Sequence, residues 1–144
     1  MTNNKQQTAV EFVPYELALE LKQLGFDEPC FGFYRSVLGK PEVEMIILQT
    51  PPRFYHLVTI PEHFDILAPT FSQAFRFFRE KHNIHSYIDI LKRYNGKSVY
   101  EFVIVSDDIE EEENNRRWKT YEEAEFECLK ELIKIVKTYG GDQQ

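Results

Sequence analysis

The sequence has few of the features that usually reveal a function. It contains two cysteines, Cys30 and Cys128, which lie far apart and have no Cys or His at metal-ligand spacing. No apolar run is long enough to span a bilayer, and the N-terminal residues lack the apolar segment of a signal peptide. We therefore expect a cytoplasmic protein, or one of the host cytoplasm if it is phage-encoded, without a membrane partner.

Catalytic motifs and positive charge are also scarce. There is no H-E-x-x-H motif, no nucleophile elbow, no Gly-rich phosphate loop and, in the acidic segment 107–113, no calcium-loop pattern. The 17 Lys and Arg residues are outnumbered by 24 Asp and Glu, which gives a formal net charge of −7. Nucleic-acid binding relies on clustered positive charge and is therefore disfavoured. No cofactor or metal is predicted, and the sequence favours a protein that is not an enzyme.

The composition that remains is typical of a folded globular chain. Of the 144 residues, 42% are hydrophobic and 28% are charged. We expect a single α+β domain over residues 11–140, with flexible tails at residues 1–10 and 141–144. Aromatic residues are numerous, with 12 Phe, 8 Tyr and 1 Trp. They can fill a core or form a contact surface, and composition alone does not separate these uses.

Three segments show the apolar spacing of amphipathic helices, and we expect helices over residues 14–24, 70–82 and 120–139. Gly25 can adopt the left-handed conformation that closes the first helix. The other two helices each open with a capping box, in which a threonine and the residue three positions later satisfy each other's backbone amides. These boxes pair Thr70 with Gln73 and Thr120 with Glu123.

Short apolar and aromatic runs between the helices predict four to five strands. They are expected at residues 30–35, 42–49, 55–60, 84–91 and 99–105. Asn95-Gly96 supplies the positive φ angles that a tight hairpin turn requires. The order favours an α+β fold with a mainly antiparallel sheet and the C-terminal helix packed on it. The alternative is an α/β arrangement in which the first strands pair in parallel across the central helix.

Positive side chains gather around the end of the second predicted helix. They could together bind a phosphate or carboxylate group, and so form a site for a small anionic ligand or a nucleotide. The same residues are also typical of a solvated helix end. This candidate ligand site consists of Arg76, Arg79, His82 and His85.

A second candidate site lies just before the last predicted helix. Arg116, Arg117 and Trp118 could dock a protein partner, since Trp and Arg are enriched at binding hot spots. Alternatively, Trp118 packs beneath the last helix. The sequence leaves both interpretations open.

Three segments resemble a group of small uncharacterised proteins of Bacteroidota and their phages. They open with Pro14-Tyr15-Glu16, Ala68-Pro69-Thr70 and Thr120-Tyr121-Glu122. No activity is assigned to that group, so the resemblance implies a phage or mobile-element setting and supplies no catalytic residues. The leading hypothesis is a non-catalytic accessory protein that binds a partner, either a protein, including a second copy of itself, or a small anionic ligand. The alternative is a small nucleotide-binding or nucleotide-cleaving protein, for example in phage counter-defence.

Overall fold

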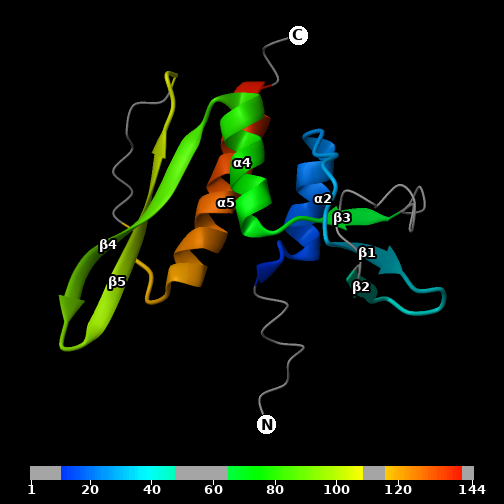
Figure 1. Ribbon diagram of the computed structural model, residues 1–144, viewed down its shortest axis with the longest axis horizontal. Coiled ribbons are helices and arrows are strands. Elements are labelled where there is room, and N and C mark those ends of the chain that lie inside the picture. Colours follow the sequence, from blue (N-terminus) through cyan, green and yellow to red (C-terminus); the bar gives the residue numbers. More distant parts are fainter. Residues whose placement is uncertain (1–10, 48–64, 109–115, 141–144) are drawn as a thin grey trace. The chain divides into compact units, whose positions relative to one another are not determined.

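A computed structural model of the chain describes residues 11–47, 65–108 and 116–140 (Figure 1). The chain divides into two compact units, Met1–Gln73 and Ala74–Gln144, and the division falls within one helix. The expected single domain of residues 11–140 stays a prediction, and both expected tails lie outside the described residues. Within the described ranges, no helix is long and apolar enough to cross a membrane.

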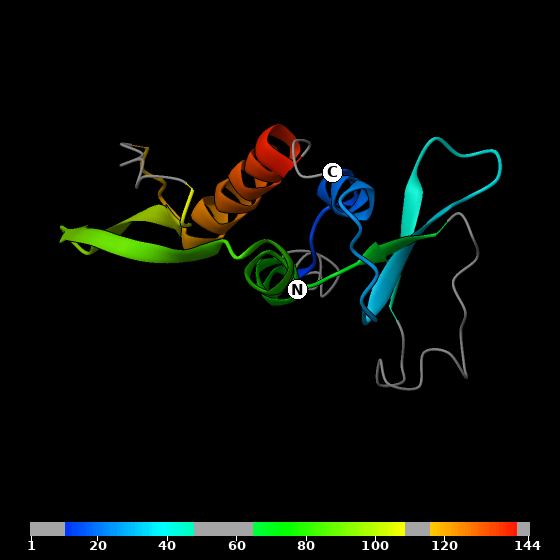
Figure 2. The ribbon, with the colours of Figure 1, turned by 90° about the horizontal axis from the view of Figure 1, so that it is seen from above.

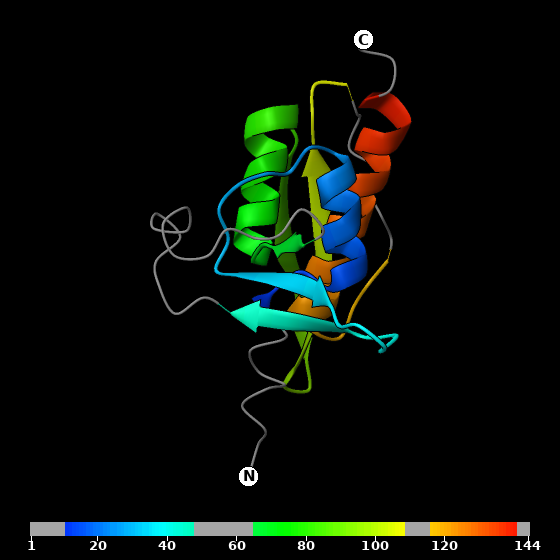
Figure 3. The same cartoon turned by 90° about the vertical axis from the view of Figure 1, so that its right-hand side faces the viewer.

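The described residues of the first unit form one complete helix and a three-stranded sheet. The helix is α2 (Tyr15–Gln23), and the strands are β1 (Gly32–Ser36), β2 (Val43–Ile47) and β3 (Ile66–Ala68). The strand order is β2-β1-β3, and both pairings are antiparallel. Figure 3 shows β1 and β2 side by side in opposite directions. Helix α2 packs against β3.

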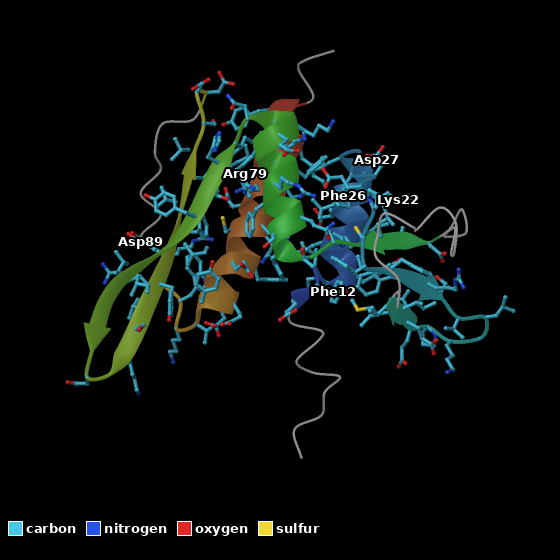
Figure 4. The ribbon with its side chains drawn as sticks, in the orientation of Figure 1. Phe12, Lys22, Phe26, Asp27, Arg79 and Asp89 are labelled. Carbon is cyan, nitrogen blue, oxygen red and sulfur yellow. The ribbon has the colours of Figure 1, made fainter. Side chains whose placement is uncertain are left out.

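Gly25 ends α2 as the sequence predicts. Its φ of 93° lies in the left-handed region that favours glycine. The Phe26 amide donates to the Leu21 carbonyl at 3.0 Å, and the Gly25 amide donates to the Lys22 carbonyl at 3.0 Å. Phe26, which Figure 4 labels just beyond this turn, is buried. The two hydrogen bonds fix where the chain leaves the helix.

A buried ion pair joins β1 to the start of β3. The Arg35 guanidinium donates twice to the Asp65 carboxylate, from Nε to Oδ1 at 3.0 Å and from Nη2 to Oδ2 at 2.8 Å. The Asp65 side chain is 2% exposed and that of Arg35 is 36% exposed. Tyr34 faces Ile66 in the antiparallel register, so the next residues along, Arg35 and Asp65, are brought opposite each other.

The second unit contains a long hairpin and the C-terminal helix. Its elements are most of α4 (Phe71–His82), β4 (His85–Tyr94), β5 (Lys97–Val105) and α5 (Tyr121–Tyr139). The strands β4 and β5 pair antiparallel and are joined by Asn95 and Gly96, with φ angles of 48° and 76°. The predicted Asn-Gly hairpin is confirmed. Helix α5 packs on both strands, so the predicted helix-on-sheet packing is also confirmed.

The capping box of Thr70 and Gln73 is complete, whereas that of Thr120 and Glu123 forms only the bond to the threonine oxygen. The Gln73 amide donates to Thr70 Oγ1 at 3.3 Å, and the Thr70 amide donates to Gln73 Oε1 at 3.0 Å. At α5, the Glu123 amide donates to Thr120 Oγ1 at 3.1 Å. The Glu123 carboxylate accepts from the Lys119 amide at 3.2 Å rather than from the cap residue itself. The second and third predicted helices therefore begin where the sequence places their caps.

The structure corrects the expected sheet. The five strands of the described ranges are divided between a three-stranded and a two-stranded sheet, and no described pairing joins them into one. Strand β1 already has a partner on each side, while β4 and β5 pair with each other through their short turn. The described strands contradict the parallel alternative, because each of their pairings is antiparallel. Strand β3 was not predicted, and the strand expected at residues 55–60 lies outside the described residues.

The aromatic residues divide between core and surface. Phe33 and Phe78 are fully buried, whereas Tyr87 and Tyr139 are 55% and 66% exposed. Cys30 and Cys128 are free and buried, as expected. Burial raises the pKa of both thiols to about 12, so they are protonated at neutral pH and pack as small apolar side chains.

Candidate interaction surface on the β4–β5 hairpin

One face of the hairpin is covered within the second unit. Phe102 is 6% exposed and stacks on Trp118, with ring centroids 5.0 Å apart. Tyr100 makes an edge-on contact with Tyr121 of α5, at 6.1 Å between ring centroids. Burial is the main cause of the raised pKa of Tyr121, with nearby glutamates adding to it. On β4, the Ser86 side chain hydrogen-bonds the Cys128 thiol of α5.

The opposite face of the hairpin is open. Successive side chains of a strand point to opposite faces, so the residues between the covered ones turn away from α5. Tyr87 is 55% exposed and Val105 is 40% exposed on this face. Asp89, which Figure 4 labels on the hairpin, lies opposite Glu101. Like charges directly opposite each other destabilise a sheet, so this face would gain from an added positive charge.

The two edges of the hairpin differ. On β5, the Trp118 amide donates to the Tyr100 carbonyl at 2.9 Å, and the Tyr100 amide donates to the Trp118 carbonyl at 2.9 Å. Trp118 therefore covers part of the β5 edge. The backbone N–H and C=O of Tyr100 point away from β4, so Tyr100 and its partner Ile90 form a pair without mutual hydrogen bonds. The backbone groups of Ile90 therefore point away from β5, and the same holds for every second residue of β4. Ser86 and Ile88 accordingly present their amides and carbonyls to the outer edge of β4.

The outer edge of β4 has no strand paired with it among the described residues. One amide on it is already satisfied, because the Ile90 amide donates to the Asp89 carboxylate at 2.8 Å. The pairing-competent part of the edge is therefore centred on Tyr87, between Ser86 and Ile88. Figures 1 and 2 show the turn end of the hairpin projecting beyond α5.

The structure does not gather the predicted anion-binding cluster into one pocket. Arg76 and Arg79 are exposed on α4, and His85 is exposed at the first position of β4. His82 is half-buried, with its ring 5.3 Å from that of Phe77. In the described part of the chain, one pocket of about 380 Å³ is lined by His82 but by none of the other three residues. The proposed anion site stays a prediction.

The second predicted cluster is divided by burial. Arg116 and Arg117 are exposed, whereas Trp118 is half-buried between its stacking contact with Phe102 and its backbone bridge to Tyr100. These contacts join Trp118 to β5, and its packing beneath the last helix stays a prediction. A docking role for Arg116 and Arg117 stays a prediction.

The residues of the open face were missed by sequence reasoning. A signal was present, because His85, Tyr87 and Asp89 alternate with apolar or small residues along a strand that was correctly predicted. In comparisons with known proteins, no family model, curated protein or solved structure matches the chain. The argument for function therefore rests on the geometry of this chain.

Proposed function

We propose that this chain is a binding protein without a catalytic role, and that it forms a homodimer by pairing β4 with β4 of a second copy. One observation carries the proposal. Among the described residues, no strand pairs with the outer edge of β4, which borders an open face on which Asp89 and Glu101 lie opposite each other. An exposed strand edge is a template for adding another strand.

A second copy fits this edge in one antiparallel register. A two-fold axis through Tyr87 places Ser86 opposite Ile88 of the second copy, and these are the residues whose backbone groups face outward. Each such pair exchanges two hydrogen bonds, and the symmetry creates two pairs, so about four bonds form. A self-complementary patch of this kind is what a two-fold homodimer requires.

The same register also complements the charges of the open face. It places His85 opposite Asp89 of the second copy, once on each side of the axis, and the two Tyr87 rings meet between them. A donor beside Asp89 offsets its repulsion from Glu101. Beyond Asp89, the hydrogen bond from Ile90 to the carboxylate occupies the edge and limits the pairing to this short segment. We therefore expect a weak dimer that depends on protein concentration.

The register predicts which substitutions change the dimer. Tyr87→Lys sets two ammonium groups against each other at the axis and should weaken dimerisation at least tenfold, which corresponds to about 1.4 kcal/mol. His85→Asp should also weaken the dimer, because it faces Asp89 across the interface. The double variant His85→Asp/Asp89→His restores the complementary pair and should recover much of the affinity. Sedimentation velocity over a range of protein concentrations measures each dissociation constant.

A matched control comes from the first unit. Leu38→Lys introduces the same charge at a fully exposed apolar residue remote in sequence from β4 and should leave dimerisation unchanged. The proposal fails if the wild-type mass is independent of concentration up to the millimolar range. It also fails if Leu38→Lys weakens association as much as Tyr87→Lys, because the contact would then not depend on β4.

The phage or mobile-element setting belongs to this proposal as an expectation from the sequence resemblance. A binding protein of such an element would act by contact with partners, and dimerisation would present two copies of each exposed surface. The nucleotide-binding alternative keeps its candidate residues Arg76, Arg79, His82 and His85. The open edge of β4 supports self-association more directly, because its unpaired groups already define a register.

A further inference from the structure

The second unit contains a pocket that the dimer does not use. Its volume is about 380 Å³, and it lies where the C-terminal ends of α4 and α5 meet the end of β5. Pockets that bind small molecules usually start at about 300 Å³. The walls are mainly polar and charged, and three aliphatic side chains also line them.

A buried nitrogen in the pocket wall lacks a partner. His82 Nε2 is buried, and no hydrogen bond to it is formed within the described part of the chain. The ring is fixed by Phe77 and Phe78, whose centroids lie 5.3 and 5.8 Å from its own. Buried polar atoms are almost always hydrogen-bonded, so this exception calls for a missing partner. Burial also lowers the pKa of His82, which leaves the imidazole neutral at pH 7 and able to accept a hydrogen bond.

The charges around the pocket are mainly negative. Asp107 and Asp108 line one wall, and the side-chain Nδ2 of Asn83 donates to Asp107 Oδ2 at 3.4 Å. The C-terminal ends of α4 and α5 add partial negative charge from their unpaired carbonyls. Lys81 is the one formal positive charge among the described lining residues. The excess of negative over positive charge in the lining disfavours an anion and favours a ligand that carries positive charge.

Three aliphatic side chains also line the pocket. Ile84 and Val136 are each 7% exposed, and Ile135 is half-buried beside them. These side chains would cover the hydrocarbon part of a ligand. We infer that this pocket binds a small organic cation, namely a protonated amine on a short apolar body, with its N–H groups shared between His82 Nε2 and the carboxylates of Asp107 and Asp108.

The test compares three probes of one shape and different charge. 2-Phenylethylamine is the cation, 2-phenylethanol the neutral analogue and phenylacetate the anion. Protein NMR should show that the amine shifts the His82 ring resonances and binds at least fivefold more tightly than the alcohol, the effect of one modest ion pair. Phenylacetate should bind more weakly than either. The inference is overturned if none of the three binds, or if the alcohol or the acid binds as tightly as the amine.

Variants then assign the contacts. Asp107→Asn/Asp108→Asn keeps the side-chain shapes and should remove the preference for the amine over the alcohol. His82→Phe keeps a ring against Phe77 and Phe78 but removes Nε2, and should weaken the amine severalfold. Asp27→Asn removes an exposed carboxylate of the first unit that does not line the pocket and should leave amine binding unchanged. Equal losses in all three variants would overturn the site. Circular dichroism checks that each variant is folded, and dimerisation is measured separately because the site does not depend on it.

Discussion

Replacing Arg35 by methionine should lower the free energy of unfolding by about 3 kcal/mol. The change removes two charged hydrogen bonds to a carboxylate that is 2% exposed. It also removes the guanidinium 5.1 Å above the Phe33 ring. The expected loss is at the lower end for buried pairs, because the Arg35 side chain is itself 36% exposed. Urea unfolding followed by circular dichroism measures it.

A second ion pair of the same unit provides the control. The Lys40 and Glu44 side chains are 61% and 60% exposed, with Lys40 Nζ 3.9 Å from Glu44 Oε1. Lys40→Met should therefore change the free energy of unfolding by no more than about 0.5 kcal/mol. Adding Asp65→Asn to Arg35→Met removes the buried charge and should restore part of the lost stability. If Arg35→Met is as mild as Lys40→Met, the buried pair does not determine the stability of this sheet.

Local patterns in the sequence predicted most of the secondary structure. The helix boundaries followed from Gly25 and the two capping boxes, and the hairpin followed from Asn95-Gly96, because each of these signals acts through neighbouring residues. Strand β3 was missed because its three residues follow a proline-rich stretch, where the sequence indicates a loop. Its strand character depends on pairing with β1, more than thirty residues away. The division into two sheets depends on similar long-range pairing.

The candidate sites were harder to predict for the same reason. Arg76, Arg79, His82 and His85 are close in sequence, yet only His82 lines the pocket. The groups that join it there, Asp107 and Asp108, come from the end of β5, and periodicity within α4 carries no information about them. The open face of β4 was also missed, because the alternation of a strand does not show which of its edges and faces the rest of the fold covers.

Truncating Phe78 to alanine should destabilise the second unit by about 3–5 kcal/mol, the usual range for a buried phenylalanine. Phe78 is fully buried, and its ring contacts those of Phe77 and His82. The loss combines the transfer of apolar surface to water with the cavity that remains. Tyr139→Ala is the control, because that ring is 66% exposed and its removal should cost no more than about 0.5 kcal/mol. Equal effects of the two variants would contradict the placement of Phe78 in the core.

The same two destabilising variants test whether the chain unfolds as one domain. Trp118 is the only tryptophan and belongs to the second unit, so its fluorescence follows that unit directly. Arg35 belongs to the first unit. A single domain over residues 11–140 predicts that Arg35→Met and Phe78→Ala both move the fluorescence transition to lower urea, because a two-state domain loses stability wherever it is weakened. A fluorescence transition that responds to Phe78→Ala alone would show that the two units unfold independently.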